Sequence, residues 1–115
     1  MIAMRPIDEP DVLALLNGGR FPGEVQGYVV MEGPRYHGHM LYRVAQGVTE
    51  VLECGVDEKP LVDGAVRACI AAGQNAGADR FRVRMEDAGL AEWFRVFCKD
   101  VPAPVPVSHL FTACG

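Results

Sequence analysis

Hydrophobic and polar positions along the chain change period several times, and each period predicts an element. Residues 1–7 are apolar enough for a first strand, although Pro6 restricts that strand to an edge or ends it early. A helix start follows at Asp8, with acids at 8, 9 and 11, Pro10 in the first turn and apolar residues at 12, 15 and 16. The run Asn17-Gly18-Gly19 ends this short helix.

Three strands with short connections are expected next. Residues 27–33 combine β-branched and aromatic residues, GPRYHG supplies a turn, and residues 39–47 form the second strand. After Gln46-Gly47, residues 48–56 form the third. Connections this short predict an antiparallel meander.

The second half of the chain alternates helix and strand. From Pro60 to Gly73 the apolar residues follow helical spacing, and Asn75-Ala76-Gly77 ends the helix with Gly77 as a left-handed cap. Residues 79–86 alternate, with apolar side chains at 81, 83 and 85 and arginines at 80, 82 and 84. Residues 87–98 form a helix with Leu90, Trp93, Phe94 and Phe97 on its buried side. After a proline-rich stretch, residues 107–113 are predicted to form a terminal edge strand.

Length, composition and charge limit the class of protein. With 115 residues, half of them hydrophobic, the chain predicts one domain spanning residues 1–115. A net charge of −4 gives no electrostatic footprint for nucleic acid or an anionic membrane, so neither partner is expected. The sequence lacks an apolar run of about 18 residues and a signal-like start, which favours a cytoplasmic location.

Cysteine and histidine positions argue against a disulfide framework or a metal site. Cys54, Cys69, Cys98 and Cys114 form no C-x-x-C pair, and reduced thiols are expected, with Cys54 and Cys69 as small hydrophobes and Cys114 exposed. His37 and His39 have no acidic or cysteine motif beside them, and a third ligand would have to be the distant His109. A turn with two solvated histidines is the preferred interpretation, and no metal is expected.

The arginine row at 80, 82 and 84 leaves three interpretations open: a solvated strand face, a site for an acidic ligand, or a partner surface.

The order of these elements, together with several local segments, resembles the GNAT family of N-acetyltransferases over about seventy residues. The matching pieces are Gly38, the run Leu41-Tyr42-Arg43-Val44, the aliphatic Val51-Leu52 leading to Val56-Asp57, the run 75–80, and the segment EWFRVFC. The resemblance implies an α/β (α+β) acyl-CoA N-acyltransferase fold, with a mixed, mostly antiparallel twisted sheet and helices on both faces.

The resemblance also implies an activity, the transfer of an acetyl group from acetyl-CoA, as cosubstrate, to a small-molecule amine or a peptide. In the family, backbone amides of the third meander strand hold the pantetheine arm, and a glycine-rich loop before the next helix holds the pyrophosphate. Carried over to this chain, the implied cofactor-binding positions are Cys54, Val56, Lys59 and Gly64. Glu53 lies where family members place a general base, and Glu50 is the second candidate. The alternative interpretation is that Glu53 is simply a solvent-facing residue of the sheet.

Two departures from the family pattern oppose catalysis. No Arg-x-x-Gly-x-Gly can be placed on DEKPLVDG at residues 57–64, where Pro60 removes a donor and three acids repel a pyrophosphate. Trp93 and Phe94 stand where members carry a tyrosine that protonates the leaving thiolate. A GNAT-like module that binds a ligand or a partner without catalysis is therefore the alternative function. A homodimer formed through the last strand or the arginine face is also possible.

Overall fold

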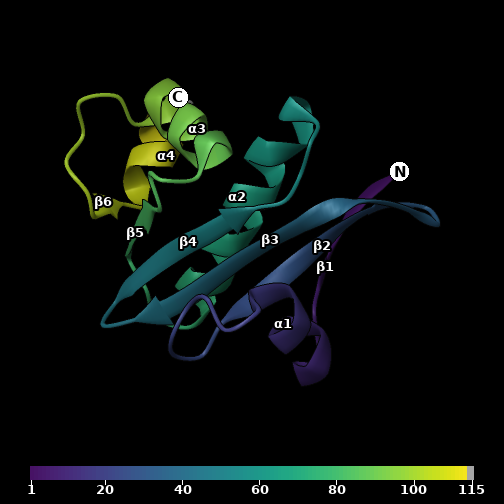
Figure 1. The fold of residues 1–115 in the computed structure, drawn as a ribbon. Coiled ribbons are helices and arrows are strands. Elements are labelled where there is room, and N and C mark those ends of the chain that lie inside the picture. Colours follow the sequence, from purple (N-terminus) through teal and green to yellow (C-terminus); the bar gives the residue numbers. More distant parts are fainter. Residues whose placement is uncertain (114–115) are drawn as a thin grey trace.

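The structure, a computed structural model, describes residues 1–113 and contains one six-stranded sheet (Figure 1). The strands are β1 (Ile2–Pro6), β2 (Gln26–Glu32), β3 (Arg35–Ala45), β4 (Val48–Cys54), β5 (Arg80–Val83) and β6 (Val105–Pro106). They lie side by side in chain order, and only β4 and β5 run parallel. The predicted mixed, mostly antiparallel sheet of an α+β domain is confirmed.

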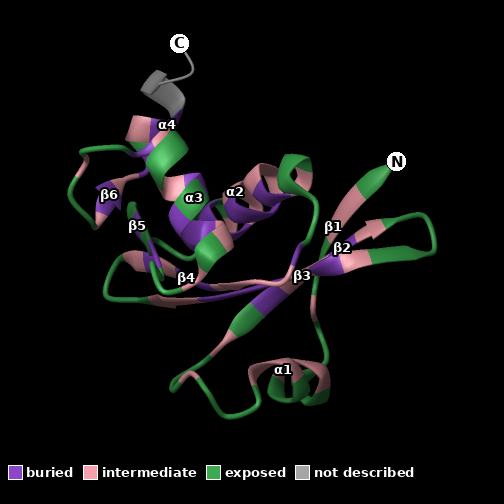
Figure 2. Cartoon of the chain, turned by 45° about the horizontal axis from the view of Figure 1, so that its top comes forward, coloured by how far each residue is buried: buried purple, intermediate pink, exposed green. Residues whose placement is uncertain are grey.

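Helices lie on both faces of this sheet, as the sequence predicted (Figure 2). The longest, α2 (Lys59–Asn75), packs with α3 (Ala88–Phe97) on one face, and α1 (Pro10–Asn17) lies on the other. Every residue of α1 is partly or fully exposed, so the core lies on the α2 and α3 side. It consists mainly of Val30, Met40, Tyr42, Val51, Val66, Cys69, Ile70, Phe81, Leu90 and Trp93.

The helix α2 forms where the apolar spacing predicted it, and its ends follow ordinary capping rules. Pro60 lies in the first turn, where a missing N–H removes no helical bond. At the other end Gly77 has φ +97°, and Ala78 N–H donates to Gly73 C=O at 2.8 Å, as in a Schellman cap. Gly73 packs directly against Thr49 of β4, which allows the helix to approach the sheet closely.

Two predicted strands differ from the structure at the C-terminal side. Residues 107–113 were predicted as an edge strand, but Ser108–Ala113 is the helix α4, and the edge strand is the shorter β6. The error arises because a short apolar run fits both periods, and Val107 and Leu110, three residues apart, are both buried. The strand predicted over residues 79–86 ends at Val83, and Met85 beyond it is 46% exposed.

The segment HGH was also predicted wrongly as a turn with solvated histidines. His37, Gly38 and His39 belong to β3, and the turn before it is confined to Gly33 and Pro34. The side chains of His37 and His39 are only 5% and 16% exposed.

The three described cysteines, Cys54, Cys69 and Cys98, are free thiols. The prediction for Cys114 falls outside the described residues.

Candidate functional site

The strands β4 and β5 separate part-way along, and this separation organises the candidate site. They pair from Val48 to Val51 of β4, after which β4 continues to Cys54 while the chain beyond β5 turns toward α3. Backbone groups of β4 beyond Val51 are thereby released from pairing on the β5 side.

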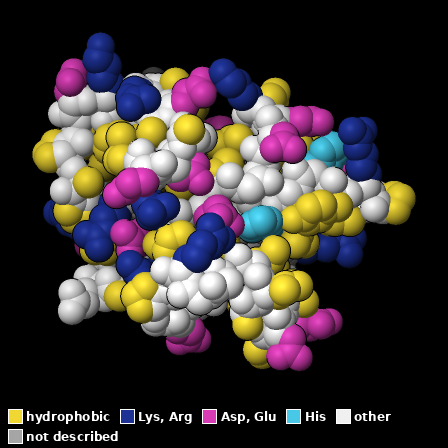
Figure 3. All heavy atoms as spheres, in the orientation of Figure 1, with side chains coloured by type: hydrophobic (Ala, Val, Ile, Leu, Met, Phe, Trp, Pro, Cys, Tyr) yellow, Lys and Arg dark blue, Asp and Glu magenta, His cyan; other side chains and the backbone are white. Residues whose placement is uncertain are grey.

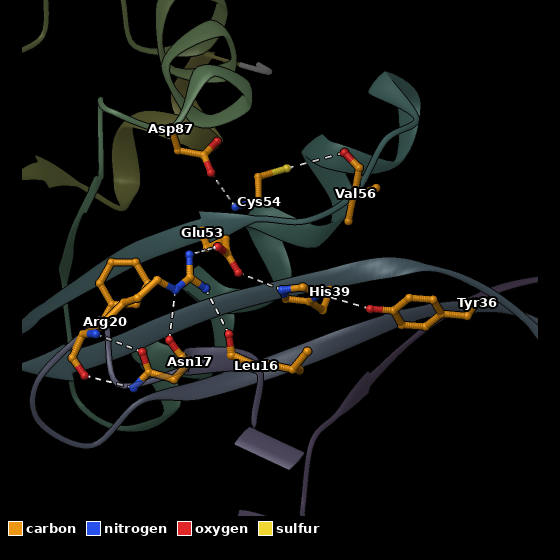
Figure 4. Close-up of polar contacts among 10 residues, drawn as sticks. Leu16, Asn17, Arg20, Tyr36, His39, Glu53, Cys54, Val56 and Asp87 are labelled. Atoms are coloured by element: carbon orange, nitrogen blue, oxygen red, sulfur yellow. Dashed lines mark hydrogen bonds and ion pairs between the residues drawn. The ribbon is translucent and has the colours of Figure 1, made fainter. Parts of the chain in front are cut away.

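Asp87 occupies the released backbone at the end of β4. Its carboxylate accepts the backbone N–H of Cys54 at 3.0 Å through one oxygen (Figure 4). Through the other oxygen it accepts the N–H of Leu90, in the first turn of α3, at 3.1 Å. Gly89 adds close packing, because a Cβ there would lie 3.3 Å from the Cys54 sulfur. Asp87 therefore fills the gap between the strands and also caps α3. The helix was predicted to begin at this residue.

A groove of about 390 Å³ lies beside this junction, between the first half of α2 and α3. Its apolar wall includes Val56, Val62, Trp93, Val96 and Phe97. The sequence predicted Trp93 and Phe97 as core residues, and both pack there while also bordering the groove.

Three carboxylates and one ammonium group complete the lining of the groove. Lys59 forms an ion pair with Glu92 at 2.8 Å. Asp63 accepts the indole N–H of Trp93 at 2.8 Å and a hydrogen bond from Arg67 at 2.8 Å. Asp57 is exposed at the rim.

The N-terminus of α2 is poorly suited to a polyanion. Pro60 offers no N–H, the N–H of Leu61 donates to Glu58 C=O at 3.0 Å, and Glu58 itself is the N-cap residue. Carboxylates at 57, 58 and 63 oppose the attraction of the helix dipole for anions.

The predicted cofactor positions come only partly together. Val56 and Lys59 line the groove. Cys54 lies beside it, with its amide occupied by Asp87, and burial raises the pKa of its thiol. Gly64 faces β1 instead, where a Cβ would come within 2.7 Å of the methyl carbon of Met4.

Glu53 lies on the opposite face of the sheet from the groove, and a β-bulge puts it there. Val51 pairs with Tyr42 and Glu53 pairs with Leu41, so Leu52 is an extra residue in β4. Without the bulge, Glu53 would share the core face with Val51, two residues before it.

On this face Glu53 is engaged by two side chains. Arg20, from the loop after α1, forms an ion pair with one carboxylate oxygen, and His39 lies 2.8 Å from the other (Figure 4). The hydrogen bond from Arg20 first, and that from His39 second, hold the pKa of Glu53 below its usual range against burial, which raises it. A carboxylate stabilised in this way is a weak general base.

His39 extends this contact to Tyr36. The phenolic oxygen of Tyr36 lies 3.0 Å from Nδ1 of His39, so a line of polar contacts runs from Arg20 through Glu53 and His39 to Tyr36 (Figure 4). Sequence reasoning weighed His39 only as a metal ligand and missed Tyr36 and Arg20. Strand alternation places residues 36 and 39 on opposite faces, and Arg20 is 33 residues away from Glu53 in the chain.

The arginine row contacts the protein itself. Arg82 and Arg43 lie on either side of Glu50, at 3.4 and 2.7 Å, Arg84 lies 5.3 Å from the ring centre of Phe21, and Arg80 donates to Pro104 C=O at 3.3 Å. These contacts agree with a strand face that needs no ligand.

Among residues 1–113, three or more His, Cys, Asp or Glu side chains nowhere gather as a metal ion would require. None of the helices described is long and apolar enough to cross a membrane.

No family model, curated protein or solved structure matches this chain.

Proposed function

We propose that this chain has a GNAT-like fold and serves as a small-molecule-binding module without acetyltransferase activity. Three features support the fold: the strand order with its single parallel pair, the separation of β4 from β5, and the entry of β4 almost directly into α2. Together they support, as a proposal, the fold that the sequence resemblance implies.

The contact between Asp87 and the amide of Cys54 carries the functional part of the proposal. In the family, amides of this strand hold the pantetheine arm of coenzyme A, so a carboxylate on the Cys54 N–H competes directly with such a ligand. Displacing Asp87 would also remove the cap of α3. The groove between α2 and α3 is a concave site with an apolar wall, and we infer that a ligand binds against this wall.

The charges at the groove select the head group of this ligand. Glu92 is paired with Lys59 and Asp63 with Arg67, so the exposed carboxylate of Asp57 makes the lining negative. An apolar body with a neutral or positively charged head is therefore favoured over the polyanionic coenzyme A.

The test uses Trp93, the single tryptophan of the chain, as a fluorescent reporter in the groove wall. Phenethylamine and phenylacetate share an aromatic body and differ in the sign of the charged group. We expect phenethylamine to bind several-fold tighter, a difference of about 1 kcal/mol for one rim carboxylate. Asp57→Asn reduces this preference, whereas Asp11→Asn on α1 leaves it unchanged. Equal binding of both compounds, or tighter binding of phenylacetate, overturns the assignment.

An acetyltransferase is the second candidate, favoured by the place of Glu53 beside the point where β4 and β5 separate. In that case acetyl-CoA is the cosubstrate, its contacts include Val56 and Lys59, and Glu53 is the base. Isothermal titration with acetyl-CoA at low salt discriminates the two candidates. Micromolar binding, followed by thiol release with an amine that Glu53→Gln abolishes, supports the enzyme. Absence of binding at millimolar cofactor supports the module.

A further inference from the structure

Three side chains on the sheet face opposite the groove form a carboxylate, imidazole and phenol line. Glu53 Oε1 lies 2.8 Å from His39 Nε2, and His39 Nδ1 lies 3.0 Å from the Tyr36 hydroxyl. Because Arg20 keeps Glu53 ionised, the carboxylate can only accept, so His39 carries its proton on Nε2. In the neutral imidazole Nδ1 is then an acceptor, and the Tyr36 hydroxyl donates to it.

Two β-bulges bring these residues to one face. In β3, Gly38 pairs with Val30 and Tyr36 with Met31, which leaves His37 as the extra residue and places Tyr36 on the same face as His39. The bulge at Leu52 does the same for Glu53. Either strand in regular alternation would break the line, so both irregularities are needed for it.

The backbone beneath His39 is shaped to hold its ring. Gly55 lies against the imidazole, and a Cβ at this position would come within 2.7 Å of Cε1. The ring is thus fixed between glycine backbone and the Glu53 carboxylate, in the order in which a catalytic triad holds its base.

The phenol of Tyr36 is the exposed end of this line. The side chains of Glu53 and His39 are 19% and 16% exposed, whereas Tyr36 is 54% exposed. Figure 3 shows this face, with a histidine side chain at the surface between charged groups and a hydrophobic side chain. A reactant can therefore reach the hydroxyl, while most of the imidazole beside it is covered.

We propose that Tyr36 is a nucleophile that accepts the acyl group of small activated acyl esters, with His39 as its base and Glu53 as a positioning residue. The phenolic oxygen forms a bond to the acyl carbon, and the bond from that carbon to the leaving oxygen breaks. The leaving group departs with that electron pair. The phenolic proton passes to Nδ1 of His39 and then to the leaving group or solvent.

The base is needed because the phenol does not ionise readily by itself. Burial first, and the negative charge of Glu53 second, raise the pKa of Tyr36. At neutral pH its reaction therefore depends on proton transfer to His39 rather than on free phenolate.

The experiment uses p-nitrophenyl acetate with the whole chain. We measure nitrophenolate release and locate the acetyl group by peptide mass spectrometry. The expected result is one acetyl group on Tyr36, absent in Tyr36→Phe, and a rate at least about tenfold lower in His39→Gln, since a positioned base contributes 10²-fold or more. His109→Gln, the same substitution on α4, leaves the rate unchanged.

Two readouts separate chemistry from a structural effect. The wild-type rate does not follow the ionisation of a lone phenol, which keeps reacting faster up to about pH 10. Added imidazole restores labelling in His39→Ala, and Glu53→Gln lowers the rate while the protein remains folded by circular dichroism. The proposal is overturned if Tyr36 is labelled equally fast in wild type and His39→Gln. It is also overturned if the rate of labelling increases with the fraction of phenolate up to about pH 10. So does wild-type acetylation that spares Tyr36. This site shares no groove residue, so its test stands independently of the proposed ligand.

Discussion

Replacement of Asp87 tests the contact on which the proposed function depends. Its carboxylate bonds two backbone N–H groups, those of Cys54 in β4 and Leu90 in α3. Asp87→Ser retains an oxygen that can cap α3 but is too short to reach Cys54 as well. The N–H of Cys54 then loses a charged acceptor in a half-buried site.

The expected loss can be worked out contact by contact. A hydrogen bond to a charged group contributes about 1.5–3 kcal/mol, and the lower end applies because Cys54 is only half-buried. Asp87→Ser should therefore lower the free energy of unfolding by about 1.5 kcal/mol. Asp87→Ala removes the cap as well, for about 1 kcal/mol more. The difference in unfolding free energy between Asp87→Ser and Asp87→Ala gives the contribution of the helix cap.

Urea unfolding followed by Trp93 fluorescence measures these differences, because Trp93 is the single tryptophan and is buried on α3. Asp87→Asn, which keeps the shape and removes the charge, serves as the matched control and should fall between wild type and Asp87→Ser. If Asp87→Ser is as stable as wild type, the Cys54 amide is not held by this carboxylate. Asp87 then does not compete with coenzyme A for this amide at the strand separation.

Three further predictions concern other parts of the molecule. Gly73→Ala should lower the melting temperature although alanine favours helix by about 1 kcal/mol, since its Cβ would overlap Thr49 Oγ1 and lie 2.9 Å from Thr49 Cβ. Adding Thr49→Ala should restore part of the lost melting temperature. If it does not, the loss does not come from a clash with Thr49. The folded-state pKa of Glu53 is depressed, so its contribution is present above the ordinary value of 4.5 and is lost as pH falls below it. The difference in unfolding free energy between wild type and Glu53→Gln should accordingly shrink in acid, and a difference independent of pH would contradict the ion pairing. Burial raises the pKa of Cys98 to about 11 and that of Cys69 further still, so iodoacetamide at pH 8 should label both in urea but spare them in the folded protein. Rapid labelling without urea would show that the helices open.

Periodicity in the sequence was sufficient for the long, regular elements. The helical spacing from Pro60 to Gly73 predicted α2 correctly, and α3 starts directly after Asp87, where the sequence predicted its helix to begin. Both depend on neighbours within one or two turns, so the sequence carries the information directly. The strand predicted over residues 107–113 was wrong, because the six residues that form α4 are too few for one period to exclude another.

The sequence by itself determined the antiparallel meander of β2, β3 and β4, the main helices and the face of α2 that packs, since these follow from apolar period and connection length. Only the tertiary structure decided which polar side chains meet. The bulges at His37 and Leu52 each shift strand parity by one residue, and they appear only when β3 is paired with its neighbours. Arg20 and Asp87 likewise reach Glu53 and Cys54 from 33 residues away in the chain. Such contacts arise from packing of the whole domain, which no local pattern encodes.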